Sequence, residues 1–589
     1  MIQLFKRLTK REWAMMLSAV FFTCLTVYLE LEVPTYISKI TELLGTENTV
    51  LSDLWQPALW MVFLSLFAFL SSVTVGYFAS RVAASFTTNL REDVFNRVLD
   101  YSQSEVKQFS IPSLLTRTTN DITQVQTMIT MGLQVVTRGP IMAIWALSKI
   151  LGKSEHWLMA VVVAVVVNVL MTTVLMTLAF PKQSLIQTLT DKLNAVTREG
   201  LMGIRVVRAY NAEDYQDDKF ASANDEVTKL NLFVYRLMAI MNPIMTGISS
   251  GLTLAIYWIG AYLINSAAVS GRLSIFSDMV VFMSYAMQVV MGFLLMGALF
   301  MVLPRTLVSA RRINQVLDLH SSIENPEIPQ TPEIENRGTV VFKDVTFRYA
   351  PTASPVIENV NFTAKKGETV AFIGSTGSGK SSLVSLIPRF YDVSQGEILV
   401  DGVNVQDYQL EELRNRVGYI PQSAVLFSGD IKSNIDFGES SESPLSEEAM
   451  WAALELAQAK TFVEEKEAGL ALEVSQGGKN FSGGQRQRLA IARALARKPE
   501  ILIFDDSFSA LDYKTDRILR QQLAEKTSDL TKLIVAQRIS TIMDADQILV
   551  LDQGQVVGQG THKELLASNE VYQEIAYSQL SKEELENGK

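Results

Sequence analysis

The chain has 589 residues, of which 48% are apolar, and its formal net charge is -10. This length exceeds what one hydrophobic core supports, so we expect several domains or a large membrane part. The acidic balance argues against a general nucleic-acid-binding protein, and the single cysteine, Cys24, excludes an intrachain disulfide or a thiolate metal cluster.

The first half of the chain contains long, sparsely charged apolar stretches. A membrane-spanning helix needs about 20 mostly apolar residues. The basic start "MIQLFKRLTKREW" runs into the first stretch without a small-residue cleavage site, which favours a retained span over a signal peptide. Arg138, Pro140 and Lys149 interrupt the third stretch. We predict six spans, at residues 14–35, 55–80, 132–152, 157–180, 238–265 and 275–303.

Basic residues predict the orientation of these spans. Lys and Arg precede the first span and are frequent in the long segments 81–131 and 181–236, whereas the short links carry few. Positive charge marks cytoplasmic loops, so both termini should face the cytoplasm. The two long segments have helical character, which predicts that the spanning helices continue into the cytosol.

Two features of the spans admit a functional and a structural interpretation. Glu30 and Glu32 lie near the outer end of the first span, where an acid either contacts a substrate or ion or reaches the interface. Methionines four residues apart line one side of the sixth span, which suits either a promiscuous cavity or ordinary packing. They are Met279, Met283, Met287 and Met291, followed by Met296 and Met301.

A linker separates this half from an α/β half. Residues 321–338, "SSIENPEIPQTPEIENRG", contain three prolines and no helical or strand periodicity. Beyond them, apolar runs such as "ETVAFIG", "ILIFDD" and "LTKLIVAQ" alternate with helical segments, as in an α/β nucleotide-binding core. We therefore predict a multidomain chain: an all-α transmembrane domain at 1–320, the linker, and a P-loop domain at 339–589.

A phosphate-binding loop follows the apolar strand "TVAFI". Its pattern is Gly374-x4-Gly379-Lys380-Ser381, in which backbone amides surround phosphate oxygens, the lysine adds a point charge, and the serine hydroxyl reaches Mg²⁺. A flexible Ser/Gly loop is the alternative, but strand, loop and helix occur in the required order. The predicted binding residues are Gly374, Ser375, Thr376, Gly377, Ser378, Gly379, Lys380, Ser381 and Ser382.

Two further motifs complete the predicted chemistry. Asp505 ends the apolar strand "ILIFD" and, together with the phosphate loop, is a candidate Mg²⁺ ligand. The turn "FSGGQ" opens a helix with Ser482, Gly483, Gly484 and Gln485, a composition that suits a phosphate group. Because the chain already has a phosphate loop, this turn is best explained as a surface for a second nucleotide, although a simple helix cap is the alternative.

These motifs, in this order and spacing, resemble an ATP-binding cassette, and the preceding spans make the chain similar to an exporter half-transporter. The resemblance implies ATP and Mg²⁺ as cofactors, with Tyr349 stacking on adenine and Gln422 contacting Mg²⁺ and the γ-phosphate. It also implies that Asp512 lies between two sites, and that the loops near residues 120–124 and 211–216 couple the domains. In this family two cassettes dimerise head to tail, each ATP lying between one phosphate loop and the other signature turn.

The chain departs from that family at two catalytic positions. The family has a Glu directly after the Walker B Asp, and here that position is Asp506; the family's later His is Gln537. Aspartate is one methylene shorter, whereas a base must lie within about 2.6–3.2 Å of its water. A displacement of about 1 Å can cost on the order of a hundredfold in rate. We therefore expect a site that binds ATP and hydrolyses it slowly.

This combination resembles the degenerate-site subunit of a heterodimeric, multidrug-type exporter. The expected partner is a second half-transporter with a Walker B Glu and an altered signature. Ser482–Gln485 of this chain would complete the partner's nucleotide site. Gln476 replaces the family's usual acid before the signature, which we interpret as a mark of pairing. The implied cargo is apolar or amphipathic, and the implied location is the plasma membrane, in a bacterial cell.

The sequence is compatible with two alternatives. The chain could form a homodimeric exporter with weak hydrolysis at both sites. It could instead be an ATP-gated channel or regulatory protein that transports little.

Overall fold

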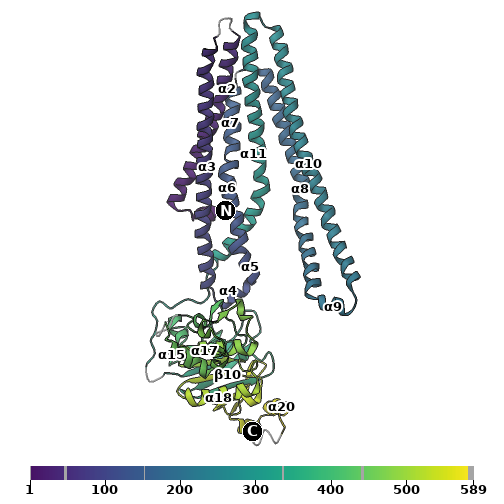
Figure 1. Cartoon of the computed structure of the whole chain (residues 1–589). Helices are drawn as coiled ribbons and strands as arrows, with labels where there is room; N and C mark the ends of the chain where they lie inside the picture. Colours follow the sequence, from purple (N-terminus) through teal and green to yellow (C-terminus); the bar gives the residue numbers. More distant parts are fainter. Residues whose placement is uncertain (1, 46–49, 152, 334–336, 439–443, 582–589) are drawn as a thin grey trace. The chain divides into compact units, whose positions relative to one another are not determined.

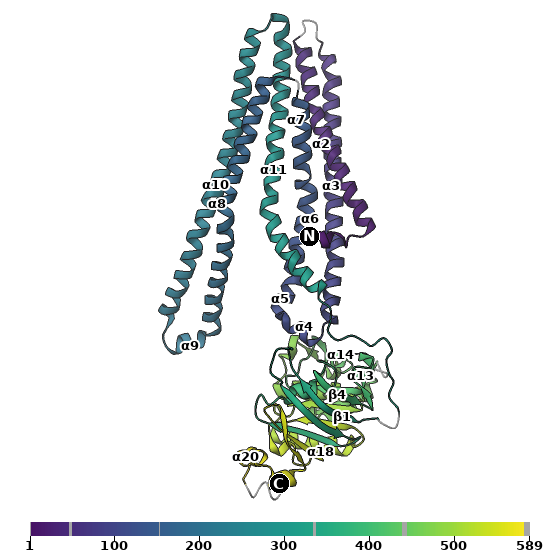
Figure 2. The same ribbon diagram turned by 180° about the vertical axis from the view of Figure 1, so that it is seen from behind.

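The computed structural model describes residues 2–45, 50–151, 153–333, 337–438 and 444–581. The chain divides into two compact units (Figures 1 and 2). The helical unit comprises Met1–Leu99 and Ile111–Leu319, and the α/β unit comprises Asp100–Ser110 and His320–Lys589. A short segment between two long helices thus belongs to the α/β unit. Residues 334–336 of the predicted linker lie outside the described residues.

The helical unit opens with α1 (Ile2–Phe5), α2 (Lys10–Leu44) and α3 (Leu51–Asp100). Helix α2 begins in a capping box, in which Thr9 Oγ1 accepts from the Glu12 amide and Glu12 Oε2 accepts from the Thr9 amide. Glu12 is buried, and its other carboxylate oxygen accepts a 2.7 Å hydrogen bond from Ser85 Oγ of α3. The capping residue therefore also joins the first two long helices.

Residues 111–150 form an almost continuous helical run with two π-helical interruptions. Its segments are α5 (Ile111–Thr116), η1 (Arg117–Asp121), α6 (Ile122–Met131), η2 (Gly132–Val136) and α7 (Arg138–Ile150). The charges that interrupt the third predicted span are paired with α2. Arg138 Nη2 lies 2.7 Å from both carboxylate oxygens of Glu30, and Lys149 Nζ lies 2.6 Å from Glu32 Oε1. Pairing of this kind makes charge tolerable at membrane depth.

Helices α8 (Glu155–Met202) and α10 (Glu213–Ser266) run side by side in opposite directions, joined by the short α9 (Ile204–Ala209), as both views show (Figures 1 and 2). The unit ends with η3 (Val269–Gly271) and α11 (Arg272–Asp318), which packs on α2 and α7. Gly139 of α7 and Gly292 of α11 permit this packing, because a Cβ on either would lie within 3 Å of the other's carbonyl oxygen.

Five helices of the described chain are long and apolar enough to cross a membrane. They overlap five of the six predicted spans: Lys10–Leu44, Leu51–Asp100, Glu155–Ala179, Glu213–Ser266 and Arg272–Met296. The third predicted span is not among them, since α7 has only 13 residues and two cationic side chains. The count of six therefore stays a prediction.

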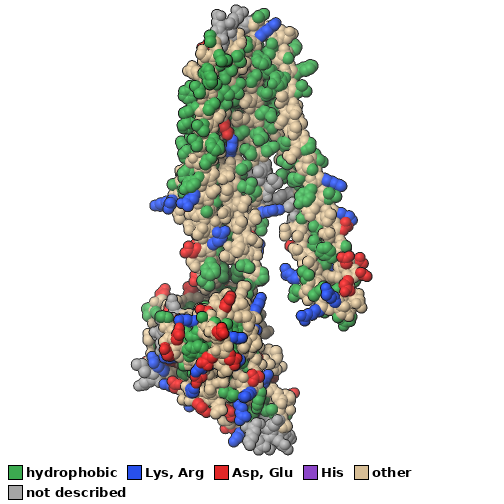
Figure 3. Space-filling view, viewed as in Figure 1, with side chains coloured by type: hydrophobic (Ala, Val, Ile, Leu, Met, Phe, Trp, Pro, Cys, Tyr) green, Lys and Arg blue, Asp and Glu red, His purple; other side chains and the backbone are tan. Residues whose placement is uncertain are grey.

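The surface of the helical unit is apolar over much of its length (Figure 3). Large side chains such as Leu66, Val73 and Trp258 are exposed along α3 and α10. Charged side chains gather instead near the α9 end of this unit (Figure 3). Continuous apolar exposure on long helices is unfavourable in water and is expected of helices that contact lipid.

The α/β unit contains a mixed six-stranded sheet in the order β12-β11-β3-β10-β9-β6, in which only β12 is antiparallel to its neighbour. A four-stranded antiparallel sheet, β2-β1-β4-β5, and a small β7-β8 pair accompany it. The strands are β1 (Val340–Phe347), β2 (Ile357–Ala364), β3 (Thr369–Gly374), β4 (Gln395–Val400), β5 (Val403–Asn404), β6 (Val417–Ile420), β7 (Gly429–Asp430), β8 (Glu473–Val474), β9 (Ile501–Asp505), β10 (Thr531–Val535), β11 (Gln547–Asp552) and β12 (Gln555–Gly560).

Apolar clusters pack on both sides of the six-stranded sheet. Alternate residues of the central strands point to opposite faces, so Ile503 and Leu533 join one cluster whereas Phe504 and Ile534 join the other. The helices are α4 (Gln103–Gln108), α12 (Lys380–Ser385), α13 (Leu410–Arg416), α14 (Ile431–Ile435), α15 (Glu447–Leu456), α16 (Lys460–Glu464), η5 (Gly469–Ala471), η6 (Gln476–Gly478), α17 (Gly483–Ala496), α18 (Tyr513–Lys526), η7 (Ile539–Thr541), α19 (His562–Ser568) and α20 (Glu570–Gln579).

Candidate functional site

The predicted phosphate loop connects the carboxyl end of β3 to the start of α12. Gly377 and Gly379 adopt φ values of +87° and +95°, which side-chain-bearing residues rarely adopt. A Cβ on Gly379 would also lie 2.6 Å from Ile357 Cδ1 and 2.7 Å from the Val356 carbonyl oxygen. These glycines are therefore required by the backbone, and the loop is not a generic Ser/Gly linker.

Lys380 is folded into this loop. Its Nζ donates to the carbonyl oxygens of Gly374 and Ser375 at 2.9 and 2.7 Å, and to Ser378 Oγ at 3.2 Å. Burial lowers the pKa of the Lys380 ammonium, and the nearby carboxylates of Asp506 and Asp505 oppose this shift. The structure thus places a buried positive charge inside the loop, where it can attract an anion.

Asp505 ends β9, a strand that is buried throughout and lies between β10 and β6. Its two carboxylate oxygens have different donors: Ser381 Oγ lies 2.6 Å from Oδ1, and the Tyr419 hydroxyl lies 3.0 Å from Oδ2. One serine hydroxyl and one carboxylate fit Mg²⁺, which usually takes few protein ligands and completes its octahedron with waters and phosphates. Tyr419 was not expected from the sequence, and its only signal was its place in "YIPQ", three residues before Gln422.

Asp506 is held by two glutamines at one oxygen. Gln537 Nε2 donates to Oδ2 at 2.7 Å, and Gln422 Nε2 donates to the same oxygen at 3.1 Å. Burial raises the pKa of the Asp506 carboxyl; the Gln422 hydrogen bond lowers it, and the charge of Asp505 adds to the rise. Asp506 also adopts φ +50°, a left-handed conformation that aspartate tolerates better than most residues.

Several of these residues, but not Asp505, line one hollow of about 190 Å³ at the carboxyl end of the parallel strands. This is the edge of an α/β sheet where ligands usually bind. The hollow brings together most of the predicted loop residues with Gln422, Asp506 and Gln537. Its lining consists of Thr376, Gly377, Gly379, Lys380, Ser381, Ser382, Gln422, Asp506, Val535 and Gln537.

The predicted signature turn does not line this hollow. It opens α17 in a capping box, where Ser482 Oγ accepts from the Gln485 amide at 3.2 Å and Gln485 Oε1 accepts from the Ser482 amide at 2.9 Å. Gly483 has no atom within 4 Å of the position of a Cβ, so the turn has an open face. Asp512, expected between two sites, caps α18 through the Thr515 amide at 3.0 Å.

Tyr349 has a half-exposed ring beside the phosphate loop. Its hydroxyl lies 2.7 Å from Ser382 Oγ, and its ring packs edge-on against Tyr391 at 5.3 Å between centroids. Lys107 Nζ of α4 lies 4.3 Å from the centre of the Tyr349 ring, within the range of a cation–π contact. Neither Lys107 nor Tyr391 was expected at this place from the sequence, because they are distant in the chain and carry no motif.

The segments expected to couple the domains differ in their surroundings. Residues 120–124 lie in η1 and α6 and pack on α11 within the helical unit. The nearby segment that belongs to the α/β unit is α4, whose Ser104 hydroxyl lies 3.2 Å from the Ser322 hydroxyl. Residues 211–216 begin with Asn211 at φ +49° and open α10 after α9. The coupling role stays a prediction for both segments.

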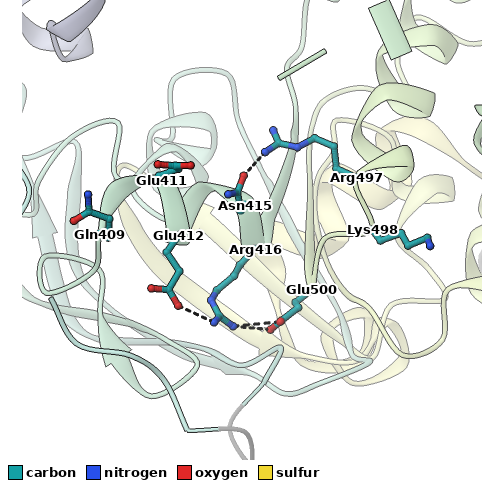
Figure 4. Close-up of a pocket in the computed structure, with 8 residues that line it drawn as sticks. All are labelled: Gln409, Glu411, Glu412, Asn415, Arg416, Arg497, Lys498 and Glu500. Atoms are coloured by element: carbon teal, nitrogen blue, oxygen red, sulfur yellow. Dashed lines mark hydrogen bonds and ion pairs between the residues drawn. The ribbon is translucent and has the colours of Figure 1, made fainter. Parts of the chain in front are cut away.

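A second polar hollow of about 390 Å³ lies at the amino ends of β6 and β9, around Arg416 (Figure 4). Arg416 pairs with Glu412 at 3.0 Å, Glu500 at 3.2 Å and Asp401 at 3.0 Å. Because its guanidinium is surrounded by carboxylates of the same chain, and because this is the opposite end of the strands from the phosphate loop, we assign it a structural role.

Comparisons with known proteins match both units. Residues 16–293 match the model of the ABC transporter transmembrane region, and residues 357–509 match the ABC transporter model. The chain is 39% identical over 510 residues to an uncharacterized ABC transporter ATP-binding protein of Mycobacterium tuberculosis, covering 87% of this chain and 86% of the relative. It is 32% identical over 536 residues to the ATP-dependent lipid A-core flippase of Xanthomonas campestris, covering 90% and 89%. A solved structure of a bacterial Atm1-family ABC exporter with ATP bound aligns with a TM-score of 0.78 and 25% identity, covering 97% and 98%.

Proposed function

Because the chain belongs to the ABC transporter family as an exporter half-transporter, with a helical transmembrane domain and an α/β nucleotide-binding domain, we propose that it is the degenerate-site subunit of a heterodimeric exporter. ATP binding, ATP-driven export and action as a dimer in a membrane follow from membership of this family. The division of labour between two unlike subunits is the part that we add.

The observation that carries this proposal is the engagement of Asp506. A water-activating base needs a free, correctly placed oxygen within about 2.6–3.2 Å of its water. Here Oδ2 already accepts from Gln422 and Gln537, so this oxygen is occupied where a base would accept the proton of a water. Gln537 provides a neutral amide where the family has a histidine, so it cannot supply the positive charge of an imidazolium.

The remaining machinery supports nucleotide binding. In this proposal ATP is held by the phosphate loop from Gly374 to Ser382 and by Tyr349, and Mg²⁺ is held by Ser381, Asp505 and Gln422. ATP would supply the terminal phosphate and Mg²⁺ would polarise it; the chain's own residues would bind and orient the nucleotide. The open face of Ser482–Gln485 supports a role in completing the site of a partner that has the Walker B Glu and an altered signature.

The proposal also includes the spans, domain bounds, orientation and location predicted from the sequence. We include a sixth span over residues 132–152, because the ion pairs from Glu30 and Glu32 neutralise its two cations. Domains at 1–320 and 339–589, cytoplasmic termini and a bacterial plasma membrane belong to the same proposal. One relative is a lipid A-core flippase, and an amphipathic or apolar cargo is consistent with that relative.

The test is purification of this chain, through an affinity tag, from membranes of its own cells. We expect a complex with one copy of a second half-transporter whose sequence has Glu after the Walker B Asp. A complex of two copies of this chain with weak ATP hydrolysis would support the homodimeric alternative, and rapid hydrolysis by this chain alone would contradict the heterodimer proposal. Uptake of cargo into vesicles that stops when the partner's Glu is changed to Gln would exclude an ATP-gated regulator.

A further inference from the structure

A hollow of about 570 Å³ lies within the helical unit, between α2, α3, α7 and α11. Its volume is within the range of small-molecule sites, about 300–1,000 Å³. One part of its lining is apolar and includes Ile37, Phe69 and Met142, whereas the other part includes Glu30, Ser284 and Gln288. Such a lining suits an amphipathic molecule.

The polar part of the lining includes two side chains with acceptor capacity that the structure leaves unused. Glu30 lines the hollow, while its partner Arg138 does not, and both carboxylate oxygens accept from the single nitrogen Nη2 of Arg138. A carboxylate has about four lone-pair positions, so acceptor capacity is left on Glu30. Gln288 Oε1 is buried and has no hydrogen-bond partner within the described part of the chain.

We propose that this hollow is a binding site for an amphipathic amine, whose ammonium group donates to Glu30 and Gln288 while its apolar body packs on Phe69 and Met142. An ammonium has three donors and no acceptor, which complements two acceptor-bearing side chains of one hollow. The ammonium would share Glu30 with Arg138 and use the lone-pair positions of the carboxylate that Arg138 leaves open. The site rests on the proposed export function and names its cargo class.

The chain offers a matched control for Glu30. Glu32 also pairs with a cation of α7, at 2.6 Å from Lys149, but it does not line the hollow. Replacing either glutamate by glutamine leaves one α7 cation without its partner. Only the Glu30 change removes a negative charge and one acceptor oxygen from the hollow, so the two variants separate loss of the site from loss of an ion pair.

The experiment measures binding of a fluorescent probe to the full-length chain in lipid nanodiscs without nucleotide. The probe is octane diamine with a dansyl group on one amine, and the comparison probe carries an acetyl group on the other amine. We expect Glu30→Gln and Gln288→Leu each to weaken binding of the free amine by about tenfold. Glu32→Gln should leave it unchanged, and the acetylated probe should bind weakly to every variant.

Equal binding of the two probes, an equal loss in Glu32→Gln, or no effect of Glu30→Gln would overturn the proposal. If Glu30→Gln does not fold, the double variant Glu30→Gln with Arg138→Gln replaces it, because it removes both members of the ion pair. Gln288→Leu leaves the ion pair intact, and unchanged binding of the free amine in this variant would also overturn the proposal. Phe69→Ala should weaken both probes. Since no nucleotide is present, failure of the heterodimer proposal would leave these binding results intact.

Discussion

The carboxylate of Asp506 differs from an effective general base in two ways. Its side chain is one methylene shorter than glutamate, and its Oδ2 atom is already bound by the side-chain amides of Gln422 and Gln537. In the proposed degenerate site, both differences act on the same step, the removal of a proton from the attacking water. Neither affects Asp505, whose carboxylate stays between Ser381 and Tyr419.

The double change Asp506→Glu with Gln537→His should therefore raise ATP hydrolysis at this site. The longer carboxylate reaches further, and the histidine replaces the neutral amide of Gln537 by a group that can carry positive charge. We expect an increase on the order of a hundredfold, since a misplacement of about 1 Å can cost that much. The measurement is phosphate release by the purified full-length chain.

Asp529→Glu is the matched control, because it makes the same change at an exposed aspartate that does not line the hollow. It should leave hydrolysis unchanged. If the double variant hydrolyses no faster than the wild type, the defect lies outside these two residues.

Tyr419 is proposed as a positioning residue for Asp505. Loss of its hydroxyl in Tyr419→Phe would free Oδ2, so the carboxylate should hold Mg²⁺ less firmly. We expect the Mg²⁺ concentration that half-saturates nucleotide binding to rise several-fold, with binding in EDTA unchanged. A fluorescent ATP analogue titrated with Mg²⁺ measures this. Tyr513→Phe, at an exposed position of α18, should have no effect; equal Mg²⁺ dependence in the Tyr419 variant would refute the role.

At the scale of elements, the ion pairs between α2 and α7 explain why two cations are tolerated in an otherwise apolar helix. Glu32→Gln and Lys149→Gln should each lower thermal stability, because each leaves one charge without its partner. The double variant should lose less than the sum, with a coupling of roughly 1 kcal/mol. Thermal unfolding in nanodiscs measures it, and strictly additive losses would show that the pair is not coupled.

The Arg416 cluster predicts a pH dependence of the α/β unit. Burial, followed by the proximity of Glu500, raises the pKa of Asp401 to about 6. In the unfolded chain this carboxyl loses its proton near pH 4, so the folded state binds more protons between these values. The associated stability is fully present below about pH 4 and lost above about pH 6, and it amounts to at most about 3 kcal/mol.

Glu500→Gln should reduce this pH dependence, because it removes the neighbouring negative charge. The comparison is the difference in unfolding temperature between about pH 4.5 and about pH 7 for the full chain, which brackets the titration of Asp401. Glu411→Gln, at a residue of the same hollow, is the control and should behave as wild type. An unaltered pH dependence in Glu500→Gln would mean that burial alone raises the pKa.

For the whole molecule, motifs with a fixed order could be predicted from the sequence. The phosphate loop, Asp505 and the signature turn each require particular residues at particular spacings. The same is true of five spans, whose length and apolarity are local properties. Contacts between distant segments were not readable. The pairing of Arg138 with Glu30, the hydrogen bond from Tyr419 and the position of Lys107 over Tyr349 depend on packing, and no local pattern announces them.

The whole chain is proposed to bind ATP and to hydrolyse it inefficiently without a partner. The most direct measurement is ATP binding and phosphate release by the full-length wild-type chain, purified alone in nanodiscs. We predict saturable ATP binding together with hydrolysis that is about a hundredfold slower than in the Asp506→Glu, Gln537→His variant. Rapid hydrolysis by the wild-type chain alone would contradict this proposal.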